Sequence, residues 1–173
     1  MNKCTLLLSL LLLPVLLMAQ PPEYIQAYEL RQAILANDID QVKTFIREGR
    51  DVNYQVDGRN ALHTACDKGL TEMAELVIEA GADVNAQSEE GAGRSPLQFV
   101  AGDIMQDSPE LLELLMKNGA DPKLSLDPDQ LPLFEAIGHA HVESVKVLLE
   151  HGAGTEVKNS MDLSPGEYVS YLI

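Results

Sequence analysis

The chain has 173 residues, a length typical of one domain, and carries a formal net charge of −15. Apolar residues make up 46% of the sequence, enough for a packed core, whereas aromatic residues make up 5% and tryptophan is absent. This composition argues against a large aromatic-lined pocket. The acidic charge disfavours binding to nucleic acid or anionic lipid and favours a basic partner, although solubility alone explains the charge nearly as well.

The N-terminal segment, residues 1–19, has the organisation of a secretory signal peptide. A short basic start, Met1 to Lys3, precedes a leucine-rich run from Thr5 to Met18, and Ala19 offers a small residue for cleavage. The run is shorter than the roughly 18 residues that a membrane-spanning helix needs. We therefore expect residues 1–19 to be removed and the mature protein to be periplasmic, with no membrane attachment. An uncleaved N-terminal anchor and a fully secreted protein are the alternatives.

Cleavage would leave residues 20–173 as a single domain with a net charge of −16. Cys66 is the one cysteine of this mature chain. A single cysteine cannot form an internal disulfide, so the stability of the domain has to come from packing.

Two short motifs recur along the mature chain. The first begins with a glycine and follows a stretch with helical spacing of apolar residues; its copies are Gly49–Asp51, Gly81–Asp83, Gly119–Asp121 and Gly152–Gly154. The second lies upstream of the first, at Leu30–Ala33, Asn60–Ala65, Ser95–Val100 and Leu131–Ala136. Together they resemble the ankyrin-repeat family, whose signature T-P-L-H-x-A recurs about every 33 residues. The resemblance covers residues 23–173 and is best from Asp57 to Ala86.

The resemblance implies an all-α ankyrin-repeat solenoid, in which helix–turn–helix units are joined by β-hairpin-like fingers. One unit cannot bury its own apolar face, so neighbouring units have to stack. We expect four repeats followed by a C-terminal half-cap. The expected bounds are 23–56, 57–86, 87–123 and 124–157 for the repeats and 158–173 for the half-cap.

The third repeat is expected to be irregular in two places. The spacing from Leu97 to Gly119 is 22 residues, whereas the corresponding spacing in the other repeats is 19 residues. Three extra residues therefore fall around 102–107, between the two helices, and the finger over 87–94 is also long. Insertions in repeat proteins often lie on a binding face, and unselected loop variation is the alternative.

The sequence contains no residue pattern that predicts catalysis. Its histidines are His63, His139, His141 and His151, and no glutamate stands at the spacing that a metalloenzyme motif requires. In the resembling family the position of His63 is structural, and Cys66 lies where a buried and unreactive thiol is expected. We therefore predict a protein that is not an enzyme and that needs no metal or cofactor.

In the resembling family, the fingertips and the exposed side of the first helices form a concave recognition face. Transferring this face position by position predicts a partner-binding surface on three fingers and at the end of one first helix. The predicted binding residues are Tyr54, Val56, Asp57, Arg59, Asp67, Lys68, Gln87, Glu89, Glu90, Arg94, Leu126, Asp127, Asp129 and Gln130. Tyr54 and the two arginines are of the residue types that often dominate interface energy.

The export signal, the binding fold and the acidic charge together predict an exported inhibitor or immunity-type protein. We expect it to be monomeric when free and to bind a basic secreted enzyme. By analogy with small exported bacterial ankyrin-repeat proteins, the expected target is a cell-wall hydrolase such as a peptidoglycan endopeptidase. The alternatives are an accessory scaffold for another periplasmic enzyme, such as an oxidative-stress enzyme, and a released effector that binds a host protein.

Overall fold

The computed structural model describes residues 20–89, 93–103 and 106–172, and the expected signal peptide lies outside this part of the chain. The described residues contain helices and turns but no β-strand. The helices are α2 (Pro22–Leu35), α3 (Ile39–Arg47), α4 (Ala61–Asp67), α5 (Thr71–Glu79), α6 (Pro96–Ala101), α7 (Pro109–Lys117), α8 (Pro132–Gly138), α9 (Val142–Glu150) and α10 (Pro165–Leu172). A 3₁₀ turn, η1 (Pro128–Gln130), precedes α8. None of these helices is long and apolar enough to cross a membrane.

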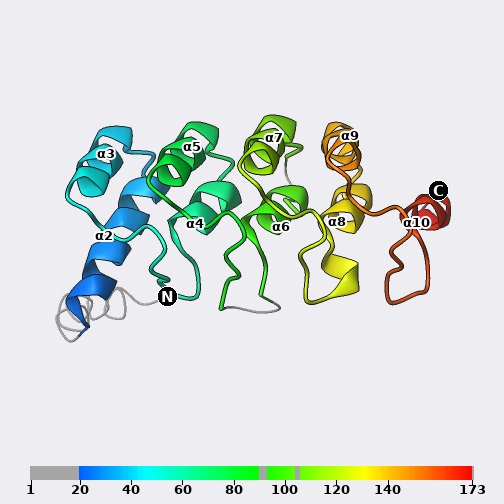
Figure 1. Cartoon of the computed structure of the whole chain (residues 1–173), viewed down its shortest axis with the longest axis horizontal. Helices are drawn as coiled ribbons and strands as arrows, with labels where there is room; N and C mark the ends of the chain where they lie inside the picture. Colours follow the sequence, from blue (N-terminus) through cyan, green and yellow to red (C-terminus); the bar gives the residue numbers. More distant parts are fainter. Residues whose placement is uncertain (1–19, 90–92, 104–105, 173) are drawn as a thin grey trace, which may run out of the picture.

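The helices form two rows that run along the molecule (Figure 1). The inner row contains α2, α4, α6, α8 and α10, and the outer row contains α3, α5, α7 and α9. The loops between successive helix pairs project beyond the inner row as fingers. Four helix pairs followed by one inner helix confirm the predicted all-α repeat solenoid with a terminal half-cap.

The tip of the first finger is a tight turn. Val56 and Arg59 form an isolated antiparallel bridge, the one such bridge outside helices in the part of the chain that is described. Asp57 and Gly58 both have positive φ, +49° and +71°. These angles match the primed turn that an Asp-Gly pair favours. The hairpin-like shape expected for the fingers is therefore produced by turns and one bridge, without strands.

Local sequence signals set where the helices begin and end. The Ser95 side chain accepts a hydrogen bond from the N–H of Gln98, and the Gln98 side chain accepts one from the N–H of Ser95 (2.8 Å). Asn60 and His63 form the same capping box at the start of α4. Gly81 follows the last turn of α5 with a φ of +93°, which a residue with a side chain rarely adopts.

One apolar core runs between the two rows of helices. Leu62, Leu97 and Leu133 contribute to it from the inner helices and are at most 3% exposed. Leu112 and Leu115 contribute from the outer row and are completely buried. Because each helix pair packs against the next pair as well as within itself, the core has no boundary between repeats.

Two asparagine side chains join consecutive repeats at the base of the fingers. Asn53 donates from Nδ2 to the carbonyl oxygen of Gly81 (2.9 Å) and accepts at Oδ1 from the N–H of Asp83 (2.8 Å). Asn85 makes the same two bonds one repeat later, at 2.9 and 2.8 Å. Lys123 takes this position in the third repeat, so the asparagine link does not continue to the fourth.

The extra residues of the third repeat supply a different link at that junction. Asp107 accepts hydrogen bonds from the N–H groups of Glu143 and Ser144, both at 3.2 Å, and from the Ser144 hydroxyl. These N–H groups lie in the first turn of α9, where a carboxylate is favourable because the donors have no partner within the helix. The insertion therefore holds the third repeat to the fourth through Asp107. Ile104 and Met105 lie outside the described residues.

Replacing Asn85 with alanine should loosen the junction between the second and third repeats. We expect Asn85→Ala to lower the free energy of unfolding by about 1–2 kcal/mol, since two hydrogen bonds of roughly 0.5–1.5 kcal/mol each are lost. Asn118→Ala is the matched control, because the Asn118 side chain bonds to Leu114 of α7 (2.8 Å) and, in the described part of the chain, to no neighbouring repeat. Urea unfolding followed by circular dichroism measures both variants. Equal stability of the two would contradict the proposed link.

Candidate protein-interaction surface

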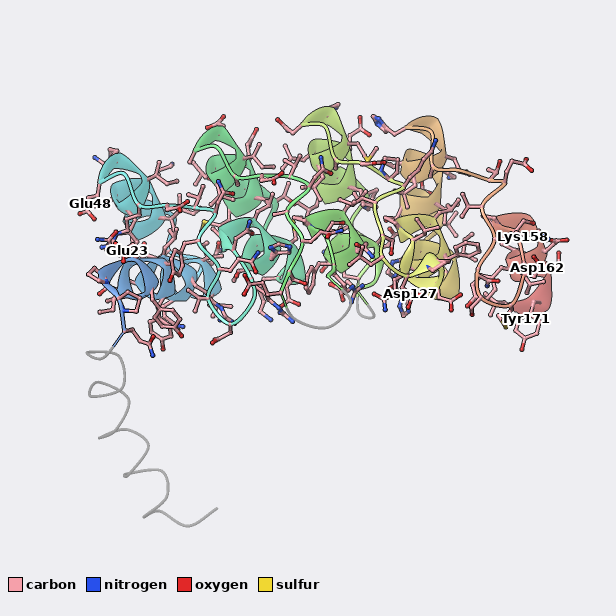
Figure 2. All side chains as sticks on the ribbon, turned by 60° about the horizontal axis from the view of Figure 1, so that its bottom comes forward. Glu23, Glu48, Asp127, Lys158, Asp162 and Tyr171 are labelled. Carbon is pink, nitrogen blue, oxygen red and sulfur yellow. The ribbon has the colours of Figure 1, made fainter. Side chains whose placement is uncertain are left out.

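The predicted binding residues belong to three fingers and to the end of α4. The first finger comprises residues 51–60, the second 83–94 and the third 121–131. The fingers lie on the same side of the solenoid, beyond the inner row (Figure 1). Figure 2 shows Asp127 on the third of them.

The first finger is attached to α2 through Arg31. Arg31 donates to the carboxylate of Asp57 (2.7 Å) and to the carbonyl oxygen of Val56 (3.2 Å). The Asp57 side chain remains 60% exposed, and Tyr54 is partly exposed. The expectation for Val56 is corrected: its side chain is 1% exposed, because the tight turn that follows it directs it into the interior. Sequence reasoning also missed Arg31, which comes from a helix outside the predicted face.

Two arginines from different repeats lie over the ring of Phe99. The guanidinium carbon of Arg59 is 4.8 Å from the ring centroid, and that of Arg94 is 5.1 Å away. Both distances allow a cation–π interaction. Arg59 also pairs with Asp67 (3.6 Å), whose other oxygen pairs with Lys68 (3.0 Å). Arg59 of the first finger is thus connected to Asp67 and Lys68 at the end of α4, and Phe99 is a member of this group that sequence reasoning missed.

Arg94 connects the second finger to two inner helices. Its Nη2 donates to the carbonyl oxygen of Gln98 (2.7 Å) and to the carboxylate of Glu135 (3.1 Å). Its backbone exchanges two hydrogen bonds of 3.0 Å with Ser88. Gly102 leaves room for the guanidinium, because a Cβ there would collide with it. Arg94 therefore positions the finger. Because 29% of its side chain is exposed, only a small part of it is accessible to a partner.

The second finger also contacts the first. The side-chain amide of Gln55 donates to the carbonyl oxygen of Gln87 (2.9 Å). The N–H of Glu89 donates to the carbonyl oxygen of Gly58 (2.9 Å) and to the side-chain oxygen of Gln55 (3.1 Å). These bonds leave the Glu89 side chain exposed at the tip. Glu90, another predicted binding residue, lies outside the described residues.

The third finger combines an exposed leucine with two carboxylates. Leu126 is 69% exposed. Asp127 accepts hydrogen bonds from the N–H of Asp129 (3.0 Å) and from the side-chain amide of Gln130 (3.3 Å). Asp129 accepts one from the N–H of Ser160 (2.9 Å), and the hydrogen bonding to Ser160 lowers the pKa of the Asp129 carboxyl. The finger therefore presents two carboxylates, both held by hydrogen bonds, beside an apolar side chain.

The second and third fingers carry carboxylates that have no basic partner among the described residues. In the part of the chain that is described, no basic side chain pairs with Glu89, Asp127 or Asp129, whereas the other described acids of the predicted set each face a cation. The two fingers meet here, because a Cβ on Gly93 would lie 2.9 Å from Cδ1 of Leu126. We call Glu89, Leu126, Asp127 and Asp129 the fingertip patch.

His63 ties the second repeat to the second finger from inside the core. The side chain is completely buried, and Nε2 donates to the carbonyl oxygen of Arg94 (3.0 Å), which confirms the expected structural role. Nδ1 accepts from the N–H of Asn60 (3.3 Å), and the ring meets Phe99 edge-on at 5.5 Å. Burial lowers the pKa of His63, and the hydrogen bond to Arg94 partly opposes this. The folded state therefore favours the neutral ring.

Acid should destabilise the protein through His63. Because its pKa is lower in the folded chain than the unfolded value of 6.5, the unfolded chain takes up the proton first as the pH falls. The contribution of His63 is thus complete above about pH 6.5 and is lost as the pH falls through that value toward the folded pKa. We expect the free energy of unfolding to depend less on pH between about 7 and 5 in His63→Gln than in the wild type. Urea titrations at each pH measure this, and an unchanged slope would assign the effect to other groups.

The described residues contain no group of three or more His, Cys, Asp and Glu side chains placed to hold a metal. The rings of His139 and His141 lie 5.7 Å apart and His139 Nε2 lies 3.7 Å from the Glu135 carboxylate, but these described side chains do not form a group that could hold a metal ion. Cys66 is 1% exposed, as expected, and burial raises the pKa of its thiol far above the usual range.

Cys66 should therefore react only when the protein opens. We expect a disulfide reagent at neutral pH to label native protein slowly and to label it rapidly in urea, since the thiolate forms only after exposure to water. The absorbance of the released thiolate follows the reaction. Complete labelling of native protein within seconds would contradict the buried position.

The profile of the family described as Ankyrin repeats (3 copies) matches residues 30–125, more than half of the chain. The chain belongs to the ankyrin-repeat family. The matched region contains the first and second fingers and the start of the third, including most of the predicted binding residues.

Proteins of very different lengths contain a region that is similar in sequence to this chain. "Ankyrin repeat and KH domain-containing protein mask-1" of Caenorhabditis elegans is 32% identical over 114 residues, which are 65% of this chain and 4% of the worm protein. The mouse "B-cell lymphoma 3 protein homolog" is 31% identical over 113 residues, 65% of this chain and 24% of that protein. The rat "Cyclin-dependent kinase 4 inhibitor B" is 35% identical over 98 residues, 56% of this chain and 70% of that protein. The chain thus spans a small part of the longer relatives and most of the short one.

Proposed function

We propose that this ankyrin-repeat protein is an exported binding protein that inhibits a basic enzyme through its finger surface. Ankyrin repeats indicate a protein–protein interaction module. The short rat relative is named as an inhibitor of a kinase, and the matched region covers 70% of it. A stack of this size therefore has a precedent as an enzyme inhibitor that acts by binding.

The fingertip patch carries the proposal. Leu126 offers exposed apolar surface on the third finger. Asp127 and Asp129 on the same finger, and Glu89 on the second finger, have no basic partner among the described residues. Unpaired carboxylates attract a basic surface over a distance of about 8–10 Å in physiological salt. The basic side chains of the same surface are engaged with carboxylates, as with Arg94 and Glu135. A basic partner is therefore favoured over an acidic one.

For the target we propose a basic cell-wall hydrolase outside the cytoplasm, with a peptidoglycan endopeptidase as the first to test. The signal-like residues 1–19 and the charge of −16 on residues 20–173 support this choice. The relatives named above come from eukaryotes, so they support binding to a protein and not the choice of target.

Residues 20–173 should bind a purified basic endopeptidase and slow its hydrolysis of peptidoglycan. Affinity should fall several-fold as salt rises from about 50 to about 200 mM, because salt screens the steering charges. Asp127→Asn combined with Asp129→Asn keeps the hydrogen-bond acceptors, removes two charges and should weaken binding by about three- to tenfold. Glu75→Gln combined with Glu79→Gln removes the same charge from α5 in the outer row and should leave affinity unchanged.

Three outcomes would contradict parts of this proposal. A saturated hydrolase that keeps its full activity would overturn inhibition and favour the accessory scaffold. Affinity that does not change with salt would overturn electrostatic steering. Equal losses in the two double variants would show that total charge, and not the fingertip patch, determines binding.

A further inference from the structure

Two neighbouring cations on the outer row have no carboxylate partner, although the protein is strongly acidic. Lys43 and Arg47 lie one turn apart on α3, and both are exposed. No described Asp or Glu pairs with either of them, whereas cations of the finger surface such as Arg31 and Arg94 pair with carboxylates. The outer row therefore has a local positive surface on a protein whose residues 20–173 carry a net charge of −16.

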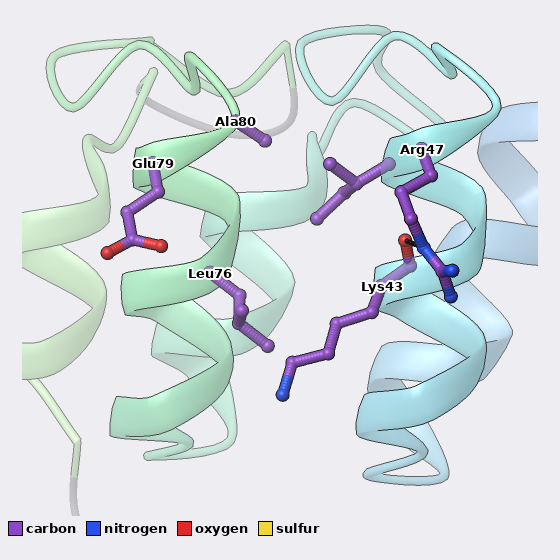
Figure 3. Close-up of a pocket in the computed structure, with 6 residues that line it drawn as sticks. Lys43, Arg47, Leu76, Glu79 and Ala80 are labelled. Carbon is purple, nitrogen blue, oxygen red and sulfur yellow. Dashed lines mark hydrogen bonds between the residues drawn. The ribbon is translucent and has the colours of Figure 1, made fainter.

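The two cations border a hollow of about 400 Å³ between α3 and α5. Its lining residues are Lys43, Ile46, Arg47, Leu76, Glu79 and Ala80. Figure 3 shows Lys43 and Arg47 on the α3 wall and Leu76 and Ala80 on the α5 wall. The carboxylate of Glu79 points to the far side of α5, away from Lys43 (Figure 3). The hollow thus combines apolar surface with positive charge.

The corresponding place between α7 and α9 is filled by a pair of side chains. Glu113, six residues before the glycine that follows α7, bonds to His151 (2.8 Å), which stands directly before Gly152. Between α3 and α5 the same two positions are Lys43 and Ala80. A methyl group stands there in place of the imidazole, and α3 and α5 also pack less closely than α7 and α9 do. The hollow therefore lies where a partner side chain for Lys43 would be expected.

The side chain of Arg47 is positioned by neutral groups. Its Nε donates to the carbonyl oxygen of Lys43 (3.1 Å), and its Nη2 donates to the hydroxyl of Thr44 (3.1 Å). Because both acceptors are uncharged, they orient the guanidinium without neutralising it, and further N–H donors remain for an anion. The apolar residues of the hollow pack against the core, which fixes the surface beside the two cations.

We propose that the hollow binds an acidic segment of a partner protein, in which an aliphatic side chain stands next to a glutamate or aspartate. The aliphatic side chain lies against Leu76 and Ala80, and the carboxylate pairs with Lys43 and Arg47. The net charge of the protein disfavours an extended polyanion such as nucleic acid or an anionic membrane, since repulsion grows with each further negative charge. The hollow lies in the outer row, away from the fingers, and its proposal does not depend on the function of the fingertip patch (Figure 1).

The test uses isotope-labelled residues 20–173 and the peptide Gly-Ser-Glu-Leu-Glu-Ser-Gly as the probe. In an NMR titration the peptide should shift the amide signals of α3 and α5, with a dissociation constant below about 5 mM. A peptide with glutamine in place of both glutamates should bind about three- to tenfold more weakly, because it lacks the charge. Unchanged signals at about 5 mM peptide, or shifts mainly outside α3 and α5, would overturn the proposal.

Substitutions on both walls of the hollow test the contacts. Lys43→Gln combined with Arg47→Gln should weaken binding of the glutamate peptide about three- to tenfold, because two ion pairs are lost. Lys117→Gln combined with Lys123→Gln is the matched control, since it removes two exposed cations elsewhere and should leave affinity unchanged. Ala80→Glu places a carboxylate of the protein itself in the hollow and should block the peptide. Thermal melts verify that all variants are folded.

A charge reversal separates specific pairing from general attraction. Lys43→Glu combined with Arg47→Glu should make α3 and α5 prefer a peptide with lysine in place of both glutamates, and the wild type should show the opposite preference. Equal binding of the glutamate peptide by the wild type and the glutamine variant of these two cations overturns the proposal. Inorganic phosphate that gives the same shifts at about 5 mM would indicate a general anion site and would overturn it too. A dimer in analytical ultracentrifugation that Ala80→Glu abolishes would identify a second copy as the occupant, against the proposal.

Discussion

The whole structure depends on contact between neighbouring helix pairs. A single pair of helices of six to fourteen residues has too little apolar surface to stay folded alone, and short isolated helices are marginal in water. The core therefore extends through all four pairs, with Leu62, Leu97 and Leu133 repeated along it. Every other feature, including the fingers, is placed by this stacking.

Polar links determine the register of the stack, and they are not uniform. The first two junctions have an asparagine that satisfies a backbone donor and acceptor of the next repeat. The third junction lacks it and has Asp107 at the start of α9. Buried His63 adds a further connection to the second finger. Because these side chains bond to backbone atoms of the neighbouring repeat, each acts on the spacing of the repeats as well as on stability.

The fingers gain a fixed shape from these links, which matters for binding. Bonds from Gln55 to the second finger and from Arg94 to α8 hold the loops before any partner arrives. A surface ordered in advance loses less conformational freedom on association than a mobile loop does. The same stacking leaves the two ends of the solenoid unlike its middle, since an end has a neighbour on one side only.

The sequence by itself determined the fold class. Glycines such as Gly81 and the leucine of each inner helix recur with a period that only stacked helix pairs satisfy, and capping residues such as Ser95 mark the helix starts. It also indicated which segments form the fingers and that His63 is structural, because these depend on position within one repeat.

Only the tertiary structure decided what individual side chains of the surface do. Val56 is buried, Arg94 is engaged with Glu135, and Asp107 caps α9. A groove of about 600 Å³ likewise combines side chains of α9 with those of α10. In most of these cases the deciding partner lies more than 20 residues away in the chain, in a neighbouring repeat. A periodic pattern describes each repeat alone, whereas burial and ion pairing at the fingers and at the ends depend on which residues the stacking brings together.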